Sequence, residues 1–503
     1  MGKLVVIGID GMDWNTTERF LPEMPSIRGI SKAGFAGEMP SIFPPDSIPS
    51  WISIFTGLDP SRHGILETID YFKKDAKDFA VDTGAFTGKT FWDAASRAGK
   101  KVIVVNPLMA YPPWEVNGVM ASGPVFISGK TAVYPQSVSA ESSLPPLGGI
   151  VDFPEKRELA GFYEKTKAET AAIVEFTAGL METRQWDLTF VTLLTMDRVC
   201  HFFWRYFDAD DPTWPGPNEH SDVIPDFHRF IDRCVGRLAK AAGEGATFMI
   251  VSDHGHAMRP PLFFNLNQYL MENGLLESRI RGPKFLSPRY HLENAKNFAL
   301  ETLHRFDLED VSYRLAHIFP LARKLKKKDF MTNPSRNIAT ASGFGGTNPF
   351  GGVEISAAKC SQEGLDYEKT RDRVIRLLLE AESRDGENIF LWARRREEMF
   401  DGPFLERYPD ILFEMRPVYG TNWSLHLPLV TVNPRHRKIS GGHRGSSVLI
   451  AGPLQGYEVA AEKVASINIA ASIASFLDLP SRGGEDPGLV PGESFLRKTR
   501  GGA

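Results

Sequence analysis

The stretch KLVVIGID, from Lys3 to Asp10, decides the fold class. It is an apolar run that ends in a carboxylate, which is typical of a central parallel strand buried on both faces. Similar runs occur at Lys101–Asn106, Leu188–Asp197, Thr247–Gly255 and Ser447–Pro453, and helical patterns lie between them at Gly161–Thr183, Phe227–Ala242 and Glu462–Leu477. This alternation predicts an α/β fold with a doubly wound, mostly parallel sheet flanked by helices. Functional groups are expected at the carboxyl ends of its strands.

The domain organisation follows from a change in composition. Residues 259–440 contain more Pro, Arg and Phe and several short elements, so we interpret them as an inserted subdomain with a late return to the sheet. Residues 1–258 and 441–503 then form the core.

Composition excludes several classes of protein. A hydrophobic share of 42% and a charged share of 24% are those of an ordinary globular protein. The net charge of -4 argues against a general nucleic-acid-binding surface. Only three cysteines occur, so we expect no disulfide framework. No apolar run approaches about 18 residues and no signal-peptide pattern is present, so we expect no membrane span and a cytoplasmic location.

Carboxylates and histidines gather where the predicted strands end. They are Asp10, Asp197, His201, Asp253, His254 and His443. Each alone has a structural explanation, as a helix cap or a buried histidine. Together they should converge, because the carboxyl ends of parallel strands meet at one edge, and Asp197 and His201 share a face if a helical turn follows their strand. Carboxylate and imidazole ligands suit Zn²⁺, with Mn²⁺ as the alternative.

A second stretch, SIFPPDSIPSWISIFTGLDPSRHGI from Ser41 to Ile65, reads as a loop, a short helix and another loop. Pro49 suits the first turn of that helix. Ser47 would then lie just ahead of the helix N-terminus, where backbone N–H groups favour an anion. Ser47 is either a helix cap or a nucleophile. The competing serines, Ser50 and Ser53, fall within the helix.

Five motifs occur in the order found in one enzyme superfamily: GIDGMD, PPDSIPSWISIFTGLDPSRHGI, TMDRVCHFFW, VSDHGH and GGHRG. The chain resembles the alkaline phosphatase superfamily, specifically its type I phosphodiesterase/nucleotide pyrophosphatase branch and the prokaryotic phosphohydrolase/phosphomutase-like group. AYPPWEVNGVMASG (Ala110–Gly123) and YEKTRDRVIRLLLEAESRDGENIF (Tyr367–Phe390) are similar to that group too, so the resemblance covers nearly the whole chain. It implies an alkaline phosphatase-like core, with residues 259–440 shaping the substrate pocket.

The resemblance also implies roles for individual residues. One divalent ion would be held by Asp197, His201 and His443, and a second by Asp10, Asp253 and His254. Ser47 takes the position of the family's nucleophile and would also contact the metal. Four further residues are candidates for substrate contact or for supporting the ligands: Arg444, His256, Trp51 and Arg62. Trp51 is a candidate either for stacking on a base or for packing.

The implied activity is that of a two-metal phosphohydrolase. The chain would act as a phosphodiesterase or nucleotide pyrophosphatase on a small phosphate ester or nucleotide-like substrate, through a phosphoseryl intermediate on Ser47. The alternatives are a phosphomonoesterase, a sulfatase-like hydrolase, a phosphomutase and a non-catalytic metal-binding protein. Trp51 stands where the sulfatase signature has Arg, and the Asn-Ser-Glu loop of the phosphomutases is absent.

Overall fold

The computed structural model describes residues 2–66, 86–125, 130–148, 153–278, 287–308, 310, 336–479 and 492–499. They divide into two compact units. The first comprises Met1–Phe207, Pro217–Ala257 and His443–Ala503, and the second comprises Asp208–Gly216 and Met258–Gly442. Asp208–Gly216 therefore groups with the second unit, although the sequence pattern placed it in the core.

The first unit is built on an eight-stranded sheet. Its strands, in spatial order, are β2 (Phe35–Pro40), β17 (Ser446–Gly452), β7 (Thr247–Val251), β1 (Leu4–Ile9), β6 (Leu188–Leu193), β3 (Val102–Val105), β4 (Gly118–Ser122) and β5 (Ala132–Tyr134). Strands β7, β1, β6, β3 and β4 are parallel, as the sequence predicts. The large, mostly parallel sheet confirms the predicted fold class.

One strand runs opposite to expectation. β17, which the sequence pattern grouped with the parallel strands, pairs antiparallel with both β7 and β2. An apolar run indicates burial on both faces but carries no information on direction, so the pattern could not reveal this. β5 is likewise antiparallel to β4.

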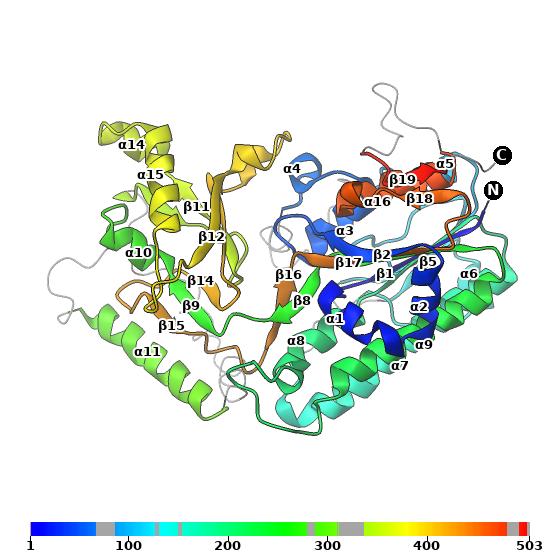
Figure 1. The fold of residues 1–503 in the computed structure, drawn as a ribbon, viewed down its shortest axis with the longest axis horizontal. Coiled ribbons are helices and arrows are strands. Elements are labelled where there is room, and N and C mark those ends of the chain that lie inside the picture. The colour runs from blue at the N-terminus through cyan, green and yellow to red at the C-terminus, as the bar shows by residue number, and fades with distance from the viewer. Residues whose placement is uncertain are drawn as a thin grey trace. The chain divides into compact units, whose positions relative to one another are not determined.

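Helices cover both faces of this sheet (Figure 1). One layer contains α1 (Trp14–Phe20), α2 (Pro25–Lys32), α7 (Leu159–Thr183), α8 (Thr195–Phe207) and α9 (Val223–Ala242). The other contains α3 (Ser47–Thr56), α5 (Phe91–Arg97) and α16 (Ile469–Phe476). Smaller elements are α4 (Pro60–His63), α6 (Val138–Glu141) and the paired strands β18 (Tyr457–Val459) and β19 (Leu496–Lys498). α7 and α9 confirm two of the predicted helices, and α16 is shorter than its prediction.

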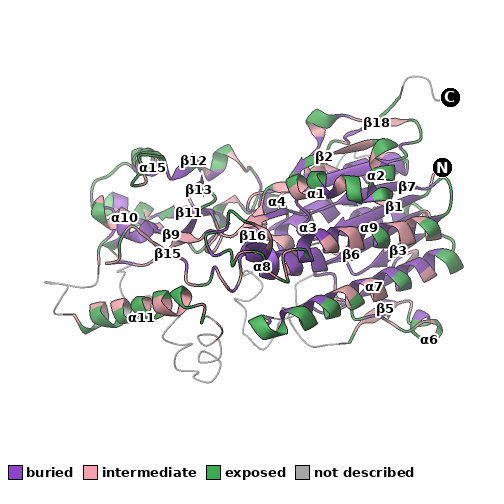
Figure 2. Cartoon of the chain, turned by 60° about the horizontal axis from the view of Figure 1, so that its bottom comes forward, coloured by how far each residue is buried: buried purple, intermediate pink, exposed green. Residues whose placement is uncertain are grey.

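The core lies between the sheet and its helices, where the strands β1, β6, β7 and β3 are buried along their lengths (Figure 2). Its largest fully buried side chains include Trp51, Phe55, Phe190, Phe91 and Trp92. Phe190 on β6 stacks on Trp92 and meets Phe55 edge-on. Aromatic packing of this kind fixes α3 and α5 against the sheet.

The second unit contains two small sheets. One has the order β10 (Ala339–Ala341), β11 (Phe350–Ile355), β13 (Ile411–Met415) and β12 (Phe390–Arg395), and the other has β14 (Tyr419–Asn422), β9 (Leu262–Asn265) and β15 (Val430–Val432). Its helices are α10 (Leu266–Glu272), α11 (Pro288–Arg305), α14 (Ala357–Gln362) and α15 (Tyr367–Leu379). The chain passes between the units within β8 (Gly255–Met258) and β16 (Gly441–Arg444), which pair with each other.

Gly8 permits close packing of α3 against the sheet. A Cβ atom at this position of β1 would lie 2.5 Å from Cη2 of Trp51. Because Trp51 is fully buried, it has no room to move aside. The absence of a side chain at Gly8 therefore sets how closely α3 packs on the sheet.

Gly8→Ala should lower the free energy of unfolding by about 1–3 kcal/mol, the usual cost of overpacking a core. The control is Gly161→Ala in α7, where a Cβ meets nothing within 4 Å. That change should leave stability unchanged or raise it by up to about 1 kcal/mol, because Ala is the better helix former. Urea unfolding of both variants tests the comparison, and equal stability of the two would contradict it.

Candidate active site

Two clusters of side chains lie at the carboxyl edge of the sheet. The His-rich cluster consists of Asp197, His201, His256 and His443, and the carboxylate-rich cluster consists of Asp10, Asp253 and His254. The structure thus brings together all six residues that the sequence nominated as metal ligands, and it adds His256. The rings of His254 and His443 stack with their centroids 3.9 Å apart, so the two clusters adjoin.

The cluster residues follow strands of the large sheet or lie in α8, β8 and β16. Asp10 directly follows β1, and Asp253 and His254 follow β7 after one intervening residue. α8 begins two residues after β6, and its first turns place the Asp197 carboxylate 3.3 Å from Nε2 of His201. The one-turn spacing read from the sequence therefore does bring these two side chains together. β8 and β16 carry His256 and His443, whose ring centroids are 5.3 Å apart.

The carboxylates are oriented by fixed donors. Trp51 Nε1 donates to Asp10 Oδ2 at 2.9 Å, and the backbone N–H of Gly11 donates to Asp253 Oδ1 at 3.1 Å. The second oxygen of Asp253, Oδ2, is buried and accepts no hydrogen bond among the described residues, and the same holds for Oδ1 of Asp197. Buried acceptors without a donor carry a desolvation cost that a bound cation would offset. The donor sets therefore fit divalent metal ions.

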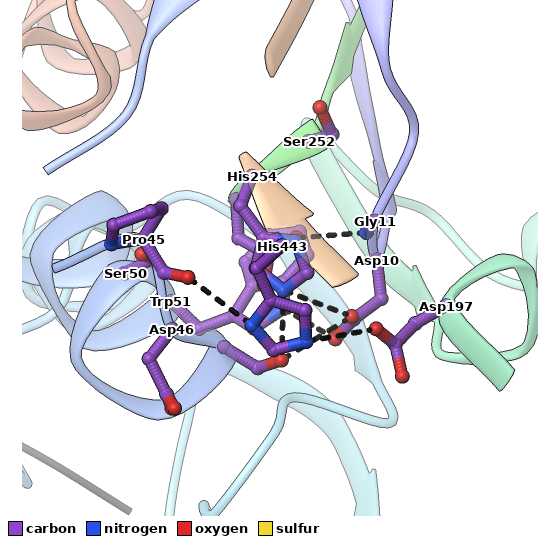
Figure 3. Close-up of polar contacts among 12 residues, drawn as sticks. Asp10, Gly11, Pro45, Asp46, Ser50, Trp51, Asp197, Ser252, His254 and His443 are labelled. Carbon is purple, nitrogen blue, oxygen red and sulfur yellow. Dashed lines mark hydrogen bonds and ion pairs between the residues drawn. The ribbon is translucent and has the colours of Figure 1, made fainter. Parts of the chain in front are cut away.

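Backbone carbonyls fix the tautomers of two histidines. Nδ1 of His443 lies 3.1 Å from the carbonyl oxygen of Pro45, and Nδ1 of His254 lies 3.1 Å from that of Gly255. A carbonyl only accepts, so each Nδ1 carries a hydrogen, and in the neutral ring Nε2 presents its lone pair to the cluster. This is the arrangement typical of metal-ligating histidines. Figure 3 shows His443 with Pro45 on one side and Asp197 on the other.

Ser47 is the first residue of α3, and its side chain lies beside the carboxylate-rich cluster. Its Oγ is 3.0 Å from Nε2 of His254 and 3.4 Å from Oδ1 of Asp10. The helix cap is Asp46, whose side chain accepts the N–H of Ile48, so the alternative that Ser47 is the cap is wrong. Asp and Ser are equally good helix caps, and here they are adjacent. The sequence alone therefore placed the start of the helix one residue too late.

The competing serines are not available to a substrate. Ser50 and Ser53 are fully buried, whereas Ser47 is partly exposed. Oγ of Ser50 lies 3.3 Å from Oγ of Ser41. Oγ of Ser53 lies 3.0 Å from Nε2 of His63. Both side chains therefore have structural partners within the fold.

His63 explains the PSRHG segment that follows α3. The N–H of Ile65 donates to its Nδ1 at 3.1 Å, so its Nε2 carries the hydrogen and donates to Ser53. Burial lowers the pKa of His63 to about 3, which keeps the ring neutral. The segment thus ties the loop after α3 back onto the helix that presents Ser47.

Burial and mutual repulsion dominate the electrostatics of the carboxylate-rich cluster. Burial, together with the charge of Asp197, holds the pKa of Asp10 well above its usual range. Burial and the charge of Asp10 do the same to the pKa of Asp253. Burial also holds the pKa of His254 well below its usual value, so this ring is neutral.

The His-rich cluster behaves differently. Burial alone would raise the pKa of Asp197, but the neighbouring imidazoles of His201, His443 and His256 hold it well below its usual range. Burial, reinforced by His201, lowers the pKa of His256. This cluster therefore presents an ionised carboxylate and a neutral His256 imidazole, the protonation states that bind metal.

The four further candidates from the sequence fall in different places. Trp51 is fully buried and holds Asp10, so it packs in the core and cannot stack on a substrate. His256 joins the His-rich cluster. Arg62 pairs with Asp59 at 3.3 Å, with its side chain nearly half exposed, and Arg444 donates to the carbonyl oxygen of His443 at 3.0 Å. The sequence carried a signal for His256, because it is two residues from His254 in an extended segment and such residues share a face.

Comparison with known proteins decides the family. A family model described as type I phosphodiesterase / nucleotide pyrophosphatase matches residues 4–421. The chain belongs to this family. The match confirms the resemblance drawn from the motifs, and it identifies the protein as an enzyme, a metal-dependent phosphoric ester hydrolase of the phosphodiesterase/nucleotide pyrophosphatase type. The matched region ends before His443, which the fold nevertheless brings into the His-rich cluster.

Solved structures show the same fold. Human ectonucleotide pyrophosphatase / phosphodiesterase 5 aligns over 96% of this phosphodiesterase-family chain and 96% of its own, with 12% identity and a TM-score of 0.50. Phosphonoacetate hydrolase from Sinorhizobium meliloti 1021, in complex with phosphonoacetate, aligns over 95% and 96% with 16% identity and a TM-score of 0.53. No curated protein matches the sequence. Among the helices that the structure describes, none has the length and apolar character required to cross a bilayer.

The raised pKa values of Asp10 and Asp253 predict that metal binding releases protons. In the metal-free enzyme these carboxyls stay protonated to a higher pH than usual, and a divalent ion requires them ionised. Affinity at this cluster should therefore fall as the pH is lowered through the raised pKa values. Calorimetric titration of metal-free protein with Zn²⁺ or Mn²⁺, in buffers of different ionisation enthalpy, measures the released protons. Asp253→Asn should reduce their number, and binding without proton release would refute the prediction.

Proposed function

We propose that this enzyme hydrolyses small phosphodiesters or nucleotide-like pyrophosphates through a phosphoryl group carried on Ser47. Two divalent ions would assist, one in each cluster. The proposal is carried by one observation: the partly exposed Ser47 Oγ lies within 3.4 Å of Asp10 and 3.0 Å of His254, at the start of a helix. Family membership supports the reaction class.

The residues divide the chemistry between them. Attack by Oγ of Ser47 forms an O–P bond and breaks the bond from phosphorus to the leaving alcohol or nucleotide, whose oxygen takes up the proton that the hydroxyl loses. Water then cleaves the O–P bond, which restores the hydroxyl and releases the phosphate product. The N-terminus of α3 favours negative charge at Ser47. Trp51 and Gly11 hold the carboxylates in place throughout. Divalent ions, when bound, lower the pKa of a hydroxyl and offset charge on phosphoryl oxygens. Zinc is the expected ion, with manganese as the alternative.

Ser47→Ala should lower turnover by about 10³-fold or more, because the nucleophile is lost. Stability should change by no more than about 1 kcal/mol, since Ser47 is not the cap. Ser50→Ala is the matched control: it removes a buried hydroxyl three residues along the same helix and should retain most of the activity. Rapidly quenched wild-type enzyme should carry a phosphoryl group on the peptide that contains Ser47. Near-normal turnover by Ser47→Ala would exclude the proposed intermediate.

Diesters should be turned over faster than monoesters. A monoester dianion calls for a dedicated cation. Arg444, which donates to the carbonyl oxygen of His443, is one candidate. The other is Arg62, the only arginine or lysine between Ser41 and Leu66. Its guanidinium is paired with Asp59. Side-by-side turnover of an aryl phosphodiester, an aryl phosphate, a nucleotide pyrophosphate and an aryl sulfate measures the preference. A monoester preference of about ten-fold, equivalent to about 1.4 kcal/mol in transition-state binding, would reverse the assignment. Preferential turnover of the sulfate would indicate a sulfatase-like hydrolase.

A further inference from the structure

His256 is the one member of the two clusters that the family pattern does not supply as a ligand. Its side chain is fully buried, and its Nε2 lies 3.6 Å from Oδ1 of Asp197 and 3.5 Å from Nδ1 of His201. A role in direct substrate binding requires access to solvent, which this ring lacks. The position of His256 is therefore explained by its contacts with the other members of the His-rich cluster.

The distances from Asp197 to the three imidazoles are those expected around a single ion. Oδ1 of Asp197 is 3.3 Å from Nε2 of His201, 3.4 Å from Nε2 of His443 and 3.6 Å from Nε2 of His256. The two Nε2 atoms of His201 and His443 are 3.1 Å apart. Tetrahedral zinc with bonds of about 2.0–2.1 Å separates its donors by roughly 3.4 Å. Asp197, His201 and His443 already stand at that spacing, and Nε2 of His256 adjoins them at 3.6 Å from Oδ1 of Asp197.

Gly11 fixes which edge of the His256 ring faces the cluster. A Cβ at Gly11, whose φ is +73°, would lie 2.8 Å from Nδ1 of His256 and 3.0 Å from Cα of Asp197. The turn after β1 is therefore packed against the Nδ1 edge of the ring. Nε2 is left as the atom directed at the other donors.

The two clusters offer chemically different donors. The His-rich cluster presents three imidazoles and one carboxylate, which is a complete tetrahedral set of protein ligands. Sites with four protein ligands are the ones that hold zinc permanently, and imidazole favours zinc. The carboxylate-rich cluster presents two carboxylates and one imidazole, next to the Ser47 hydroxyl. Oxygen donors favour harder ions such as Mn²⁺ or Mg²⁺.

We infer that His256 is a fourth protein ligand in the His-rich cluster, which makes this cluster a tight, zinc-selective site, while the carboxylate-rich cluster holds an exchangeable ion of the Mn²⁺ type. The inference rests on the proposed function, because it concerns how the two metal positions of that site differ. It assigns a separate property to each position, and both can be measured without an activity assay.

The first experiment counts ions in the full chain. Metal-free wild-type protein, supplied with Zn²⁺ and Mn²⁺ together, should take up one of each per chain, and dialysis against graded chelators should remove manganese first. His256→Gln should lower the affinity for the retained zinc by at least about 100-fold, at or beyond the upper range for loss of an outer-shell partner. His228→Gln is the matched control, because His228 is an equally buried histidine in α9 whose Nδ1 bonds the Ile224 carbonyl oxygen. It should keep the zinc.

The second experiment needs no variant, so it stands even if His256→Gln does not fold. X-ray absorption of wild-type protein with one equivalent of Zn²⁺ should show three imidazole ligands. Two imidazoles, or unchanged zinc affinity in a folded His256→Gln protein, would overturn the inference and leave phosphorylation of Ser47 untouched. Three imidazoles with no phosphoryl group on Ser47 would instead refute the proposed function and leave the ligand assignment standing.

Discussion

Three acidic side chains, those of Asp10, Asp197 and Asp253, are held close together at one edge of the sheet. Asp10 and Asp253 are almost completely buried; besides burial, the charge of Asp197 raises the pKa of Asp10, and that of Asp10 raises the pKa of Asp253. Such a concentration of acidic groups is unfavourable in a low-dielectric interior unless positive charge is supplied. The surrounding structure is arranged around that requirement. Fixed donors occupy one oxygen of Asp10 and one of Asp253, and imidazoles crowd the rest of the space.

The need to hold these acidic side chains in place explains why the residues that support them are buried. Trp51 is at once a core residue against Phe55 and Phe190 and the donor that orients Asp10. Trp51 therefore serves both the core and the site, and the missing side chain at Gly8 lets its ring pack closely on β1. His63 and Ser53 extend this buried support to the helix that presents Ser47. The Ser47 hydroxyl, the proposed nucleophile, is thus positioned by buried contacts.

Sequence patterns were sufficient for what depends on local periodicity and on strand ends. They predicted the parallel strands β1, β3, β6 and β7, the helices α7 and α9, and the six residues that the structure brings together. These patterns failed where two adjacent residues can play the same role. They also failed where the pairing of distant strands determines the structure. The cap fell on Asp46 and not on Ser47, because both residue types satisfy the same backbone donors. The direction of β17 depends on its partners, which no apolar run encodes. The ligand geometry of His256 depends on the pairing of β8 with β16, although its spacing from His254 gave a signal.

The position of β17 has a consequence for the order in which the molecule can assemble. β2 joins the large sheet through β17 alone, yet residues 35–40 leave the ribosome some 400 residues before residues 446–452. During synthesis, the edge strand β2 must therefore wait until the whole of the second unit has been made. His443 arrives with the same late segment, so the His-rich cluster closes only after that unit has been synthesised. Loop closure over so long a stretch of chain is slow. The His-rich cluster is thus one of the last parts of the first unit to form.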